Sequence, residues 1–233
     1  MKEIIIFGTG EIAELANYYF KNDPKSKNKV VGFTVDDEFV KSDIFLGKPL
    51  IPLSEIKTTF PPDKYSAHVA LSYQKLNRLR EEKYYFMKSL GYKLVSYVCS
   101  KSAFWDDLHH GENCFILENQ TIQPTVKIGN NVMIWSTNHL GHNCEIKDHV
   151  YLASGITVSG HTIIGERTFV GVNVAFKDFI EIGSDCFITM GSNILRNIPS
   201  DSTATSNEIF HKDHLANKKL RLNIKSCLYC NYE

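Results

Sequence analysis

Four of the nine histidines in this sequence lie close together in its second half: His139, His142, His149 and His161. Imidazole is the side chain whose unperturbed pKa lies nearest to neutral pH, so a neutral histidine can accept a proton from an attacking amine or hydroxyl group. Cys144 lies in the same stretch and could act as a nucleophile, although a small cysteine is more often packed in a core. The stretch therefore predicts a site for proton transfer.

A glycine-rich turn near the start of the chain could bind a phosphate group. Residues 8–13 read G-x-G-x-x-A and join an apolar run at residues 3–7 to a helical stretch. Glycines let backbone amides at a helix N-terminus approach a phosphate, and a carboxylate after the next strand can accept hydrogen bonds from a ribose or a base. Taken alone, the glycine pattern also fits an ordinary tight turn. The predicted nucleotide contacts are Gly8, Gly10, Asp36 and Asp37.

Strand-like and helix-like segments alternate in the first part of the chain. This alternation predicts a Rossmann-like βαβ domain of the α/β class over residues 1–98, built on a small parallel sheet. The domain is too short for a full dinucleotide fold, so we expect it to bind a mononucleotide. The predicted strands are residues 3–7, 29–35, 68–71 and 93–98, and the predicted helices are residues 11–21 and 74–90.

A period of six residues dominates the second part of the chain. From Ile116 to Ile194 every sixth residue is apolar, a run that chance would produce roughly 7 times in a million. Similar segments recur every eighteen residues, as at Ile128 and Ile146. Neither a helix nor simple strand alternation gives this pattern, and a β-sandwich would show irregular spacing. We therefore predict a parallel β-helix with three sides over residues 99–200, followed by a C-terminal extension of unknown role at residues 201–233.

Composition excludes several classes of protein. The chain has 26 basic and 26 acidic side chains, and this balance argues against nucleic acid as a partner. No apolar run approaches the roughly 18–20 residues that span a bilayer, and the run before Gly8 is too short for a signal peptide. We therefore predict a cytoplasmic protein that does not bind membranes. Its six cysteines, at positions 99, 114, 144, 186, 227 and 230, are expected to be reduced thiols.

The six-residue period resembles that of the hexapeptide acyltransferases, which fold as left-handed parallel β-helices. Together with the N-terminal domain, it makes nearly the whole chain, to about Ser200, resemble the PglD-like (or NeuD-like) nucleotide-sugar acetyltransferases of bacteria. This resemblance implies a homotrimer that transfers an acetyl group from acetyl-CoA to an amino or hydroxyl group of a sugar, usually one carried by a nucleoside diphosphate. It also implies that the nucleotide binds to the N-terminal domain and acetyl-CoA in a groove between subunits.

Residues 138–149 carry the specific part of the resemblance. The family places its general base two residues after an inward aliphatic residue, and His142 follows Leu140 at that spacing. A second family histidine near the substrate corresponds to His149, and the glycine whose amide approaches acetyl-CoA corresponds to Gly160. The family often has a glutamate directly after the base, whereas this chain has Asn143; Glu145 or Asp148 could take over its role.

The remaining site assignments follow from proximity to these positions. We expect His139 to contact the sugar, Ser159 and Gly160 to line the pantetheine groove, and Asp178 and Arg196 to lie near the cofactor, with Arg196 as a possible phosphate partner. The basic segment at residues 218–221 is another possible phosphate partner. Five histidines are expected on the surface without a role: His109, His110, His161, His211 and His214.

The predicted function is N-acetylation of a UDP- or dTDP-linked amino sugar for bacterial surface glycans such as O-antigen, with His142 as the base. O-acetylation on the same scaffold and a non-catalytic nucleotide-sugar-binding protein remain alternatives. A γ-type carbonic anhydrase would need a His-x4-His pair, which the histidine cluster lacks. The single C-x-x-C pair, Cys227 and Cys230, does not make a structural zinc site, so we expect no metal.

Overall fold

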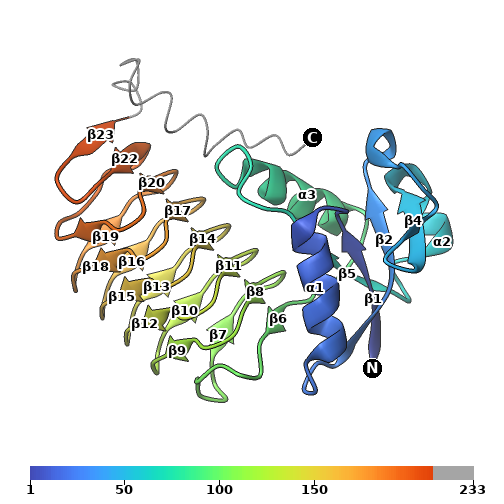
Figure 1. The fold of residues 1–233 in the computed structure, drawn as a ribbon, viewed down its shortest axis with the longest axis horizontal. Coiled ribbons are helices and arrows are strands. Elements are labelled where there is room, and N and C mark those ends of the chain that lie inside the picture. The colour runs from blue at the N-terminus through green and yellow to red at the C-terminus, as the bar shows by residue number, and fades with distance from the viewer. Residues whose placement is uncertain (212–233) are drawn as a thin grey trace.

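The computed structural model describes residues 1–211. An α/β region lies beside a stack of short β-strands, and the two parts pack side by side along the stack (Figure 1). No helix within the described range is long and apolar enough to cross a membrane. The predictions for residues 218–221, His214, Cys227 and Cys230 fall outside the described residues.

The α/β region is built on a five-stranded sheet with the strand order β3-β4-β2-β1-β5. β1 pairs in parallel with both β2 and β5, so β1, α1 and β2 form the predicted βαβ unit. Side chains alternate along β1: Ile4 and Ile6 pack in the same cluster as α1, whereas Ile5 and Phe7 pack with α2 and α3. The elements are β1 (Lys2–Phe7), α1 (Glu11–Asn22), β2 (Asn28–Val35), a 3-10 helix (Asp37–Phe39), β3 (Ile44–Phe45), β4 (Lys48–Pro52), a second 3-10 helix (Leu53–Glu55), α2 (Ile56–Thr59), β5 (Ser66–Val69) and α3 (Arg78–Ser89).

Two predicted elements of this region differ in the structure. The helix expected over residues 74–90 begins only at Arg78, because residues 75–77 have φ between 52° and 64°, outside the right-handed helical region. The strand expected over residues 93–98 is divided: Leu94 bridges β5, whereas Tyr97 and Val98 join the stack. Pairing with two different distant strands causes this division, and the local strand propensity of residues 93–98 does not predict it.

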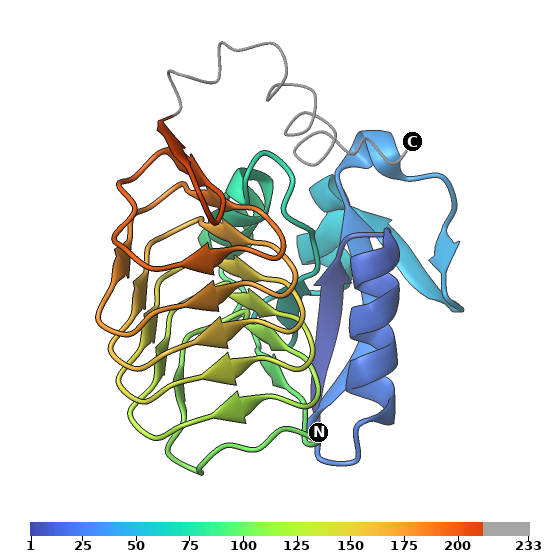
Figure 2. The same cartoon turned by 60° about the vertical axis from the view of Figure 1, so that its left-hand side comes forward.

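The stack is a parallel β-helix with three sides, each a ladder of short strands (Figure 2). Its geometry fits the left-handed β-helix expected from the hexapeptide resemblance. The first side contains β7 (His109–His110), β10 (Lys127–Ile128), β13 (Glu145–Ile146), β16 (Ile163–Ile164) and β19 (Glu181–Ile182). The second side contains β6 (Tyr97–Val98), β8 (Phe115–Ile116), β11 (Met133–Ile134), β14 (Tyr151–Leu152), β17 (Phe169–Val170), β20 (Phe187–Ile188), β22 (Ser202–Ala204) and β23 (Ile209–His211). The third side contains β9 (Thr121–Ile122), β12 (His139–Leu140), β15 (Thr157–Val158), β18 (Ala175–Phe176) and β21 (Asn193–Ile194).

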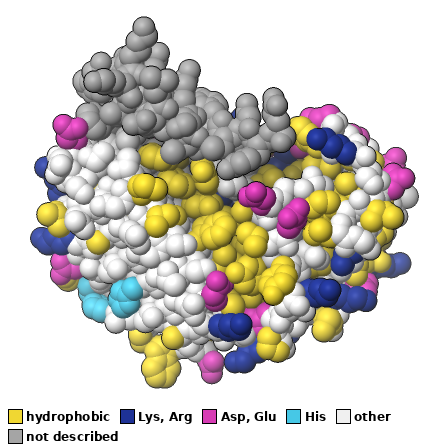
Figure 3. All heavy atoms as spheres, in the orientation of Figure 1, with side chains coloured by type: hydrophobic (Ala, Val, Ile, Leu, Met, Phe, Trp, Pro, Cys, Tyr) yellow, Lys and Arg dark blue, Asp and Glu magenta, His cyan; other side chains and the backbone are white. Residues whose placement is uncertain are grey.

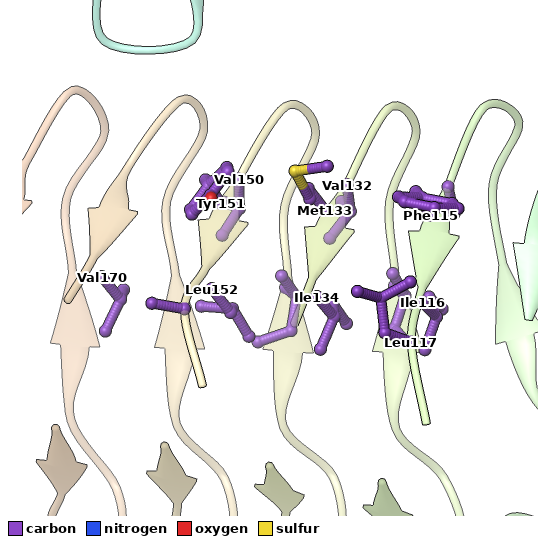
Figure 4. Packing of buried hydrophobic residues seen from close by; sticks show 14 of the residues in the cluster. Phe115, Ile116, Leu117, Val132, Met133, Ile134, Val150, Tyr151, Leu152 and Val170 are labelled. Atoms are coloured by element: carbon purple, nitrogen blue, oxygen red, sulfur yellow. The ribbon is translucent and has the colours of Figure 1, made fainter. Parts of the chain in front are cut away.

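The predicted aliphatic period forms the interior of the stack. Ile128 pairs with Ile146, and Ile146 with Ile164, so each coil advances by eighteen residues. These three side chains are at most 1% exposed. Figure 4 shows the equivalent row on the second side, where Ile116, Ile134, Leu152 and Val170 follow one another through the interior. The spacing found in the sequence is therefore the repeat of one complete coil.

Each corner of the stack contains a residue with positive φ, three positions after the inward aliphatic residue. Asn143, His149 and His161 hold such positions, with φ of 57°, 64° and 59°. This left-handed conformation is unfavourable for most side chains, and asparagine tolerates it better than most. The side chain of a corner residue points away from the interior of the stack. Corner residues of successive coils therefore form columns of side chains that can take part in chemistry.

The stack continues beyond the predicted end of the β-helix at residue 200. β22 pairs in parallel with β20 and adds to the second side, and β23 returns antiparallel to β22. Residues 202–204, in the predicted C-terminal extension, thus add one more strand to the second side. The six-residue period ends at Ile194, yet main-chain pairing still extends the ladder.

Arg80 of α3 joins the α/β region to the stack. Its side chain is 2% exposed and donates hydrogen bonds to the main-chain carbonyl groups of Ser72, Asn131, His149 and Val150 and to the side-chain oxygen of Asn77. Burial lowers the pKa of this guanidinium to about 10. A buried cation is tolerated when its donors are satisfied, and here neutral oxygen atoms satisfy them.

Replacing one inward residue should show how much the interior contributes. We expect Ile164→Ala to lower the free energy of unfolding by about 2–5 kcal/mol, because the fully buried side chain leaves a cavity. The neighbouring Ile163 points outward and is partly exposed, so Ile163→Ala should cost about 1 kcal/mol or less. Urea unfolding of both variants measures the difference. Equal losses would contradict the assignment of the inward position.

Comparing Arg80→Met with Arg78→Met should show how much more the buried hydrogen bonds of Arg80 contribute to stability than an exposed ion pair on the same helix. Arg80→Met leaves several buried carbonyl groups without a donor, so we expect a loss of about 3 kcal/mol in unfolding free energy. Arg78 on the same helix pairs with Asp185 at 2.8 Å, but its side chain is 45% exposed. Arg78→Met should therefore cost about 1 kcal/mol or less in the same urea titration. A larger effect at Arg78 than at Arg80 would contradict this picture of the interface.

Candidate functional site

The corner that follows β12 brings two histidines together at the surface. His142 lies at this corner and His161 lies one coil further on, and both are exposed. Their ring centroids are 5.1 Å apart and the rings meet edge to face, at 86°. Figure 3 shows histidine side chains next to each other on the surface of the stack, on the side away from the α/β region.

Asn143 lies between these two rings. Its side-chain nitrogen Nδ2 is 3.1 Å from Nδ1 of His142 and 3.4 Å from Nε2 of His161. Two hydrogen bonds join this corner to the preceding coil. The main-chain N–H of His142 donates to Gln123 Oε1 at 2.8 Å, and that of Asn143 donates to Thr125 Oγ1 at 3.0 Å. These hydrogen bonds fix the main chain that carries the imidazole of His142.

Gly160 lies against the ring of His142. A Cβ atom added at Gly160 would lie 2.8 Å from Cε1 and 2.9 Å from Nε2 of His142. Any other residue would displace the ring, so the glycine allows the imidazole to extend over the next coil. His142 and Gly160, both predicted site residues and eighteen positions apart in the sequence, are thus in contact in the structure.

His161 was expected on the surface without a role. It is exposed as predicted, but it lies beside His142, and its other side is covered by Phe179. The rings of His161 and Phe179 stack at 4.5 Å with an interplanar angle of 8°, although Phe179 is itself 70% exposed. The eighteen-residue spacing from Asn143 to His161 to Phe179 is the signal that could have revealed this column.

His149 lies at a different corner from His142, between the first and second sides, under α3. It is 1% exposed, its Nδ1 is 2.9 Å from the amide of Asn131, and its ring packs against Tyr85. Burial, and to a smaller extent the charge of Arg80, lowers the pKa of His149 to about 4. The structure therefore places His149, which was predicted near the substrate, at a different corner from His142 and covers it with the α/β region.

The other predicted residues of the stack differ in their surroundings. Cys144 is 1% exposed, and burial raises its pKa to about 12, which disfavours the thiolate that a nucleophile requires. His139 and Ser159 are half-buried, His139 on β12 and Ser159 immediately before Gly160. Asp178 and Arg196 are both exposed.

The glycine-rich turn lies at the carboxyl end of β1. Gly8 has a φ of 125°, and a Cβ atom there would lie 2.7 Å from the carbonyl oxygen of Ala70, so this position requires glycine. Gly10 caps the N-terminus of α1, and a Cβ atom there would meet nothing within 4 Å. The turn therefore leaves the first turn of α1 open to an anionic group.

Asp36 and Asp37 follow β2 at the same edge of the sheet but already have partners. Asp36 accepts a hydrogen bond from Lys83 Nζ of α3 at 2.6 Å. Asp37 accepts one from the main-chain N–H of Ser54 at 3.0 Å, and contacts with Ser54 lower the pKa of Asp37. Asp37 thus holds a loop together, and Asp36 brings a lysine to the glycine-rich edge.

Within residues 1–211, no group of three or more His, Cys, Asp or Glu side chains is arranged to hold a metal ion. The four cysteines of this range, Cys99, Cys114, Cys144 and Cys186, are free and buried.

Comparison with protein families identifies the repeat. Residues 125–160, which include His142, Asn143 and Gly160, match the family model described as bacterial transferase hexapeptide (six repeats). The chain carries a bacterial transferase hexapeptide repeat. A sequence search of curated proteins gives no match.

Solved structures share the fold over most of the chain. The acetyltransferase domain of PglB from Neisseria gonorrhoeae is 19% identical, with a TM-score of 0.78 over 90% of this chain and 98% of that one. A variant of perosamine N-acetyltransferase from Caulobacter crescentus, solved with CoA and GDP-perosamine, is 20% identical, with a TM-score of 0.78 over 90% and 96%. WeeI from Acinetobacter baumannii is 18% identical, with a TM-score of 0.73 over 90% and 99%. The chain thus shares its fold with these three solved structures.

The buried state of His149 predicts a pH dependence of stability. Its pKa is about 4 in the folded protein against 6.5 for an unperturbed histidine, so between these values the unfolded chain binds the proton more readily. Stability should therefore fall as the pH falls from 6.5 towards 4, by about 1.6 kcal/mol between pH 6.5 and pH 5 from this group alone. Urea unfolding at both pH values should show a smaller loss for His149→Asn, and His109→Asn, at an exposed position, should leave the loss unchanged. The same pH dependence in His149→Asn and wild type would contradict the assignment.

Proposed function

We propose that this protein is an acetyltransferase that uses acetyl-CoA to acetylate the amino group of a nucleotide-linked sugar. The observation that carries the proposal is the exposed imidazole of His142, anchored by the preceding coil and placed against Gly160 of the next. Support also comes from the shared fold: the PglB domain has been solved with acetyl coenzyme A, and the perosamine enzyme with CoA and GDP-perosamine.

In the proposed reaction, the amine nitrogen attacks the carbonyl carbon of the acetyl thioester. Nε2 of neutral His142 accepts the proton that the nitrogen loses, directly or through a water molecule. The main-chain amide near Gly160 stabilises the negative charge on the thioester oxygen, a contribution of about 3–4 kcal/mol for one well-placed donor. The carbon–sulfur bond then breaks, and coenzyme A leaves as a thiol after taking a proton. No acyl-enzyme is needed, in agreement with the burial of Cys144.

We propose residues 1–98 as the nucleotide-binding domain and residues 99–200 as the acetyltransferase domain, with β6 at the end of the first and β22 after the second pairing with the stack. Gly8 and Gly10 present the N-terminus of α1 to a diphosphate, and Lys83, held by Asp36, adds a positive charge at the same edge. Asp36 is thus a contact through its lysine, and Asp37 supports the loop. Either UDP or dTDP would satisfy these contacts, as would another nucleoside diphosphate.

A homotrimer with acetyl-CoA between neighbouring stacks is part of the proposal. Ser159 and Gly160 would line the pantetheine groove, and exposed Asp178 and Arg196 lie further along the stack in the direction of the chain. His139 on β12 precedes the same corner and would face the sugar. The corner position of His142 leaves it open to such a neighbouring chain.

Release of thiol from acetyl-CoA, measured with a panel of nucleotide-linked amino sugars, tests the function. We expect turnover with at least one amino sugar and none with its hydroxyl analogue, because an alcohol is harder to deprotonate. His142→Gln should then lower kcat by about 10²–10⁴-fold with little change in KM, because it removes the base and leaves the binding surface intact. His109→Gln serves as the matched control, since His109 lies on β7 at an exposed position.

Two results would contradict this proposal. An unchanged kcat in His142→Gln would remove the assigned base. Binding of a nucleotide sugar without thiol release from any acceptor would favour the non-catalytic alternative, and turnover of the hydroxyl sugars would favour O-acetylation.

A further inference from the structure

The pair formed by Asn143 and His161 has no part in the reaction as described above. A histidine acts as a base at Nε2 only when its proton is on Nδ1, and a carboxylate beside Nδ1 usually enforces this tautomer. No carboxylate is recorded in contact with the His142 ring among the described residues; its Nδ1 faces the amide of Asn143 instead. The orientation of this amide therefore decides whether His142 can accept a proton at Nε2.

The two orientations of the amide have opposite consequences. With the nitrogen towards the rings, Asn143 donates to Nδ1 of His142, and the proton of that imidazole must then be on Nε2, where it blocks the base. With the oxygen towards the rings, Nδ1–H of His142 donates to Asn143 and Nε2 is free. Oxygen and nitrogen of an amide exchange places by a half-turn with almost no change in shape, so the neighbours decide between them.

We propose that His161 and Asn143 act together as positioning residues that keep His142 in the tautomer required of a base; this inference rests on the proposed function. Nδ2 of Asn143 lies 3.1 Å from Nδ1 of His142 and 3.4 Å from Nε2 of His161. A half-turn of the amide places the oxygen at this point instead, with one lone pair for Nδ1–H of His142 and one for Nε2–H of His161. Donation from His161 favours the oxygen-inward orientation of Asn143. The face-to-face stack with Phe179 holds the plane of the His161 ring.

Protonation of His142 during the reaction favours the same orientation. An imidazolium ion carries N–H groups on both ring nitrogens, so an inward amide nitrogen would set two donors against each other. An inward amide oxygen keeps its hydrogen bond, which becomes stronger because the donor is now charged. The pair thus supports His142 before and after proton transfer without rearrangement, although it provides less stabilisation than a carboxylate would.

Histidine-selective ¹⁵N NMR of the full chain tests this proposal directly. In the neutral state we expect the proton of His142 on Nδ1 and that of His161 on Nε2. The measurement reports the tautomer whether or not the protein is an enzyme. A His142 resonance of the Nε2–H tautomer would overturn the proposal.

Kinetics of matched variants provide the second test. Partners that orient a functional imidazole typically contribute about 10- to 100-fold, so Asn143→Leu should lower kcat by that factor with KM unchanged. Asn143→Asp, which keeps an acceptor, should retain kcat or raise it, and His161→Phe should lower it less than Asn143→Leu. Asn173→Leu is the control, because Asn173 has the same corner conformation, with φ of 56°, at an exposed position on another corner.

The outcomes separate this proposal from the proposed function. Wild-type protein that releases no thiol with any acceptor would refute the acetyltransferase function, whereas the NMR result would still decide the tautomer. Active wild-type protein with an unchanged kcat in Asn143→Leu would refute the positioning role alone. Equal losses in Asn143→Leu and Asn173→Leu would assign the effect to backbone strain at the corner and would also refute it.

Discussion

The eighteen-residue register between successive coils is the constraint on which this structure depends. Main-chain hydrogen bonds such as Gly129 N–H to the carbonyl of Ile146 join each coil to the next, and one aliphatic side chain per side fills the interior. A shift by one residue would turn the inward row outward, so burial of the aliphatic groups fixes the register strongly. As a consequence, every side chain has its neighbours eighteen residues before and after it.

Because of this register, residues eighteen positions apart in the sequence lie side by side on the surface of the stack. Asn143, His161 and Phe179 occupy one column of corners and leave the stack into solvent, where the amide and the two rings touch. Asn131 and His149 occupy another column with the same backbone conformation, but α3 covers it. The difference in chemistry between His142 and His149 therefore comes from what covers each corner, because the backbone geometry repeats.

Arg80 is one of the residues that hold α3 over the corner with His149. Its buried guanidinium donates to carbonyl groups of two coils, at Asn131 and at His149, and has no ion pair with a carboxylate among residues 1–211. Around it, Glu81 and Arg167 form an ion pair of 3.1 Å between α3 and the stack. These contacts hold the α/β region against one edge of the stack, and the corner with His142 stays exposed.

The sequence alone determined the periodic part of this protein. The inward aliphatic row, the length of a coil, the βαβ unit and the contact between His142 and Gly160 all follow from patterns that repeat along the chain, because burial imposes the same period on residues and on structure. Only the tertiary structure decided that His149 is buried under α3 and that Asp36 pairs with Lys83. The burial of His149 depends on which surface of the α/β region meets the stack, and the pairing of Asp36 with Lys83 depends on how α3 packs against the sheet. No period in the sequence predicts either contact.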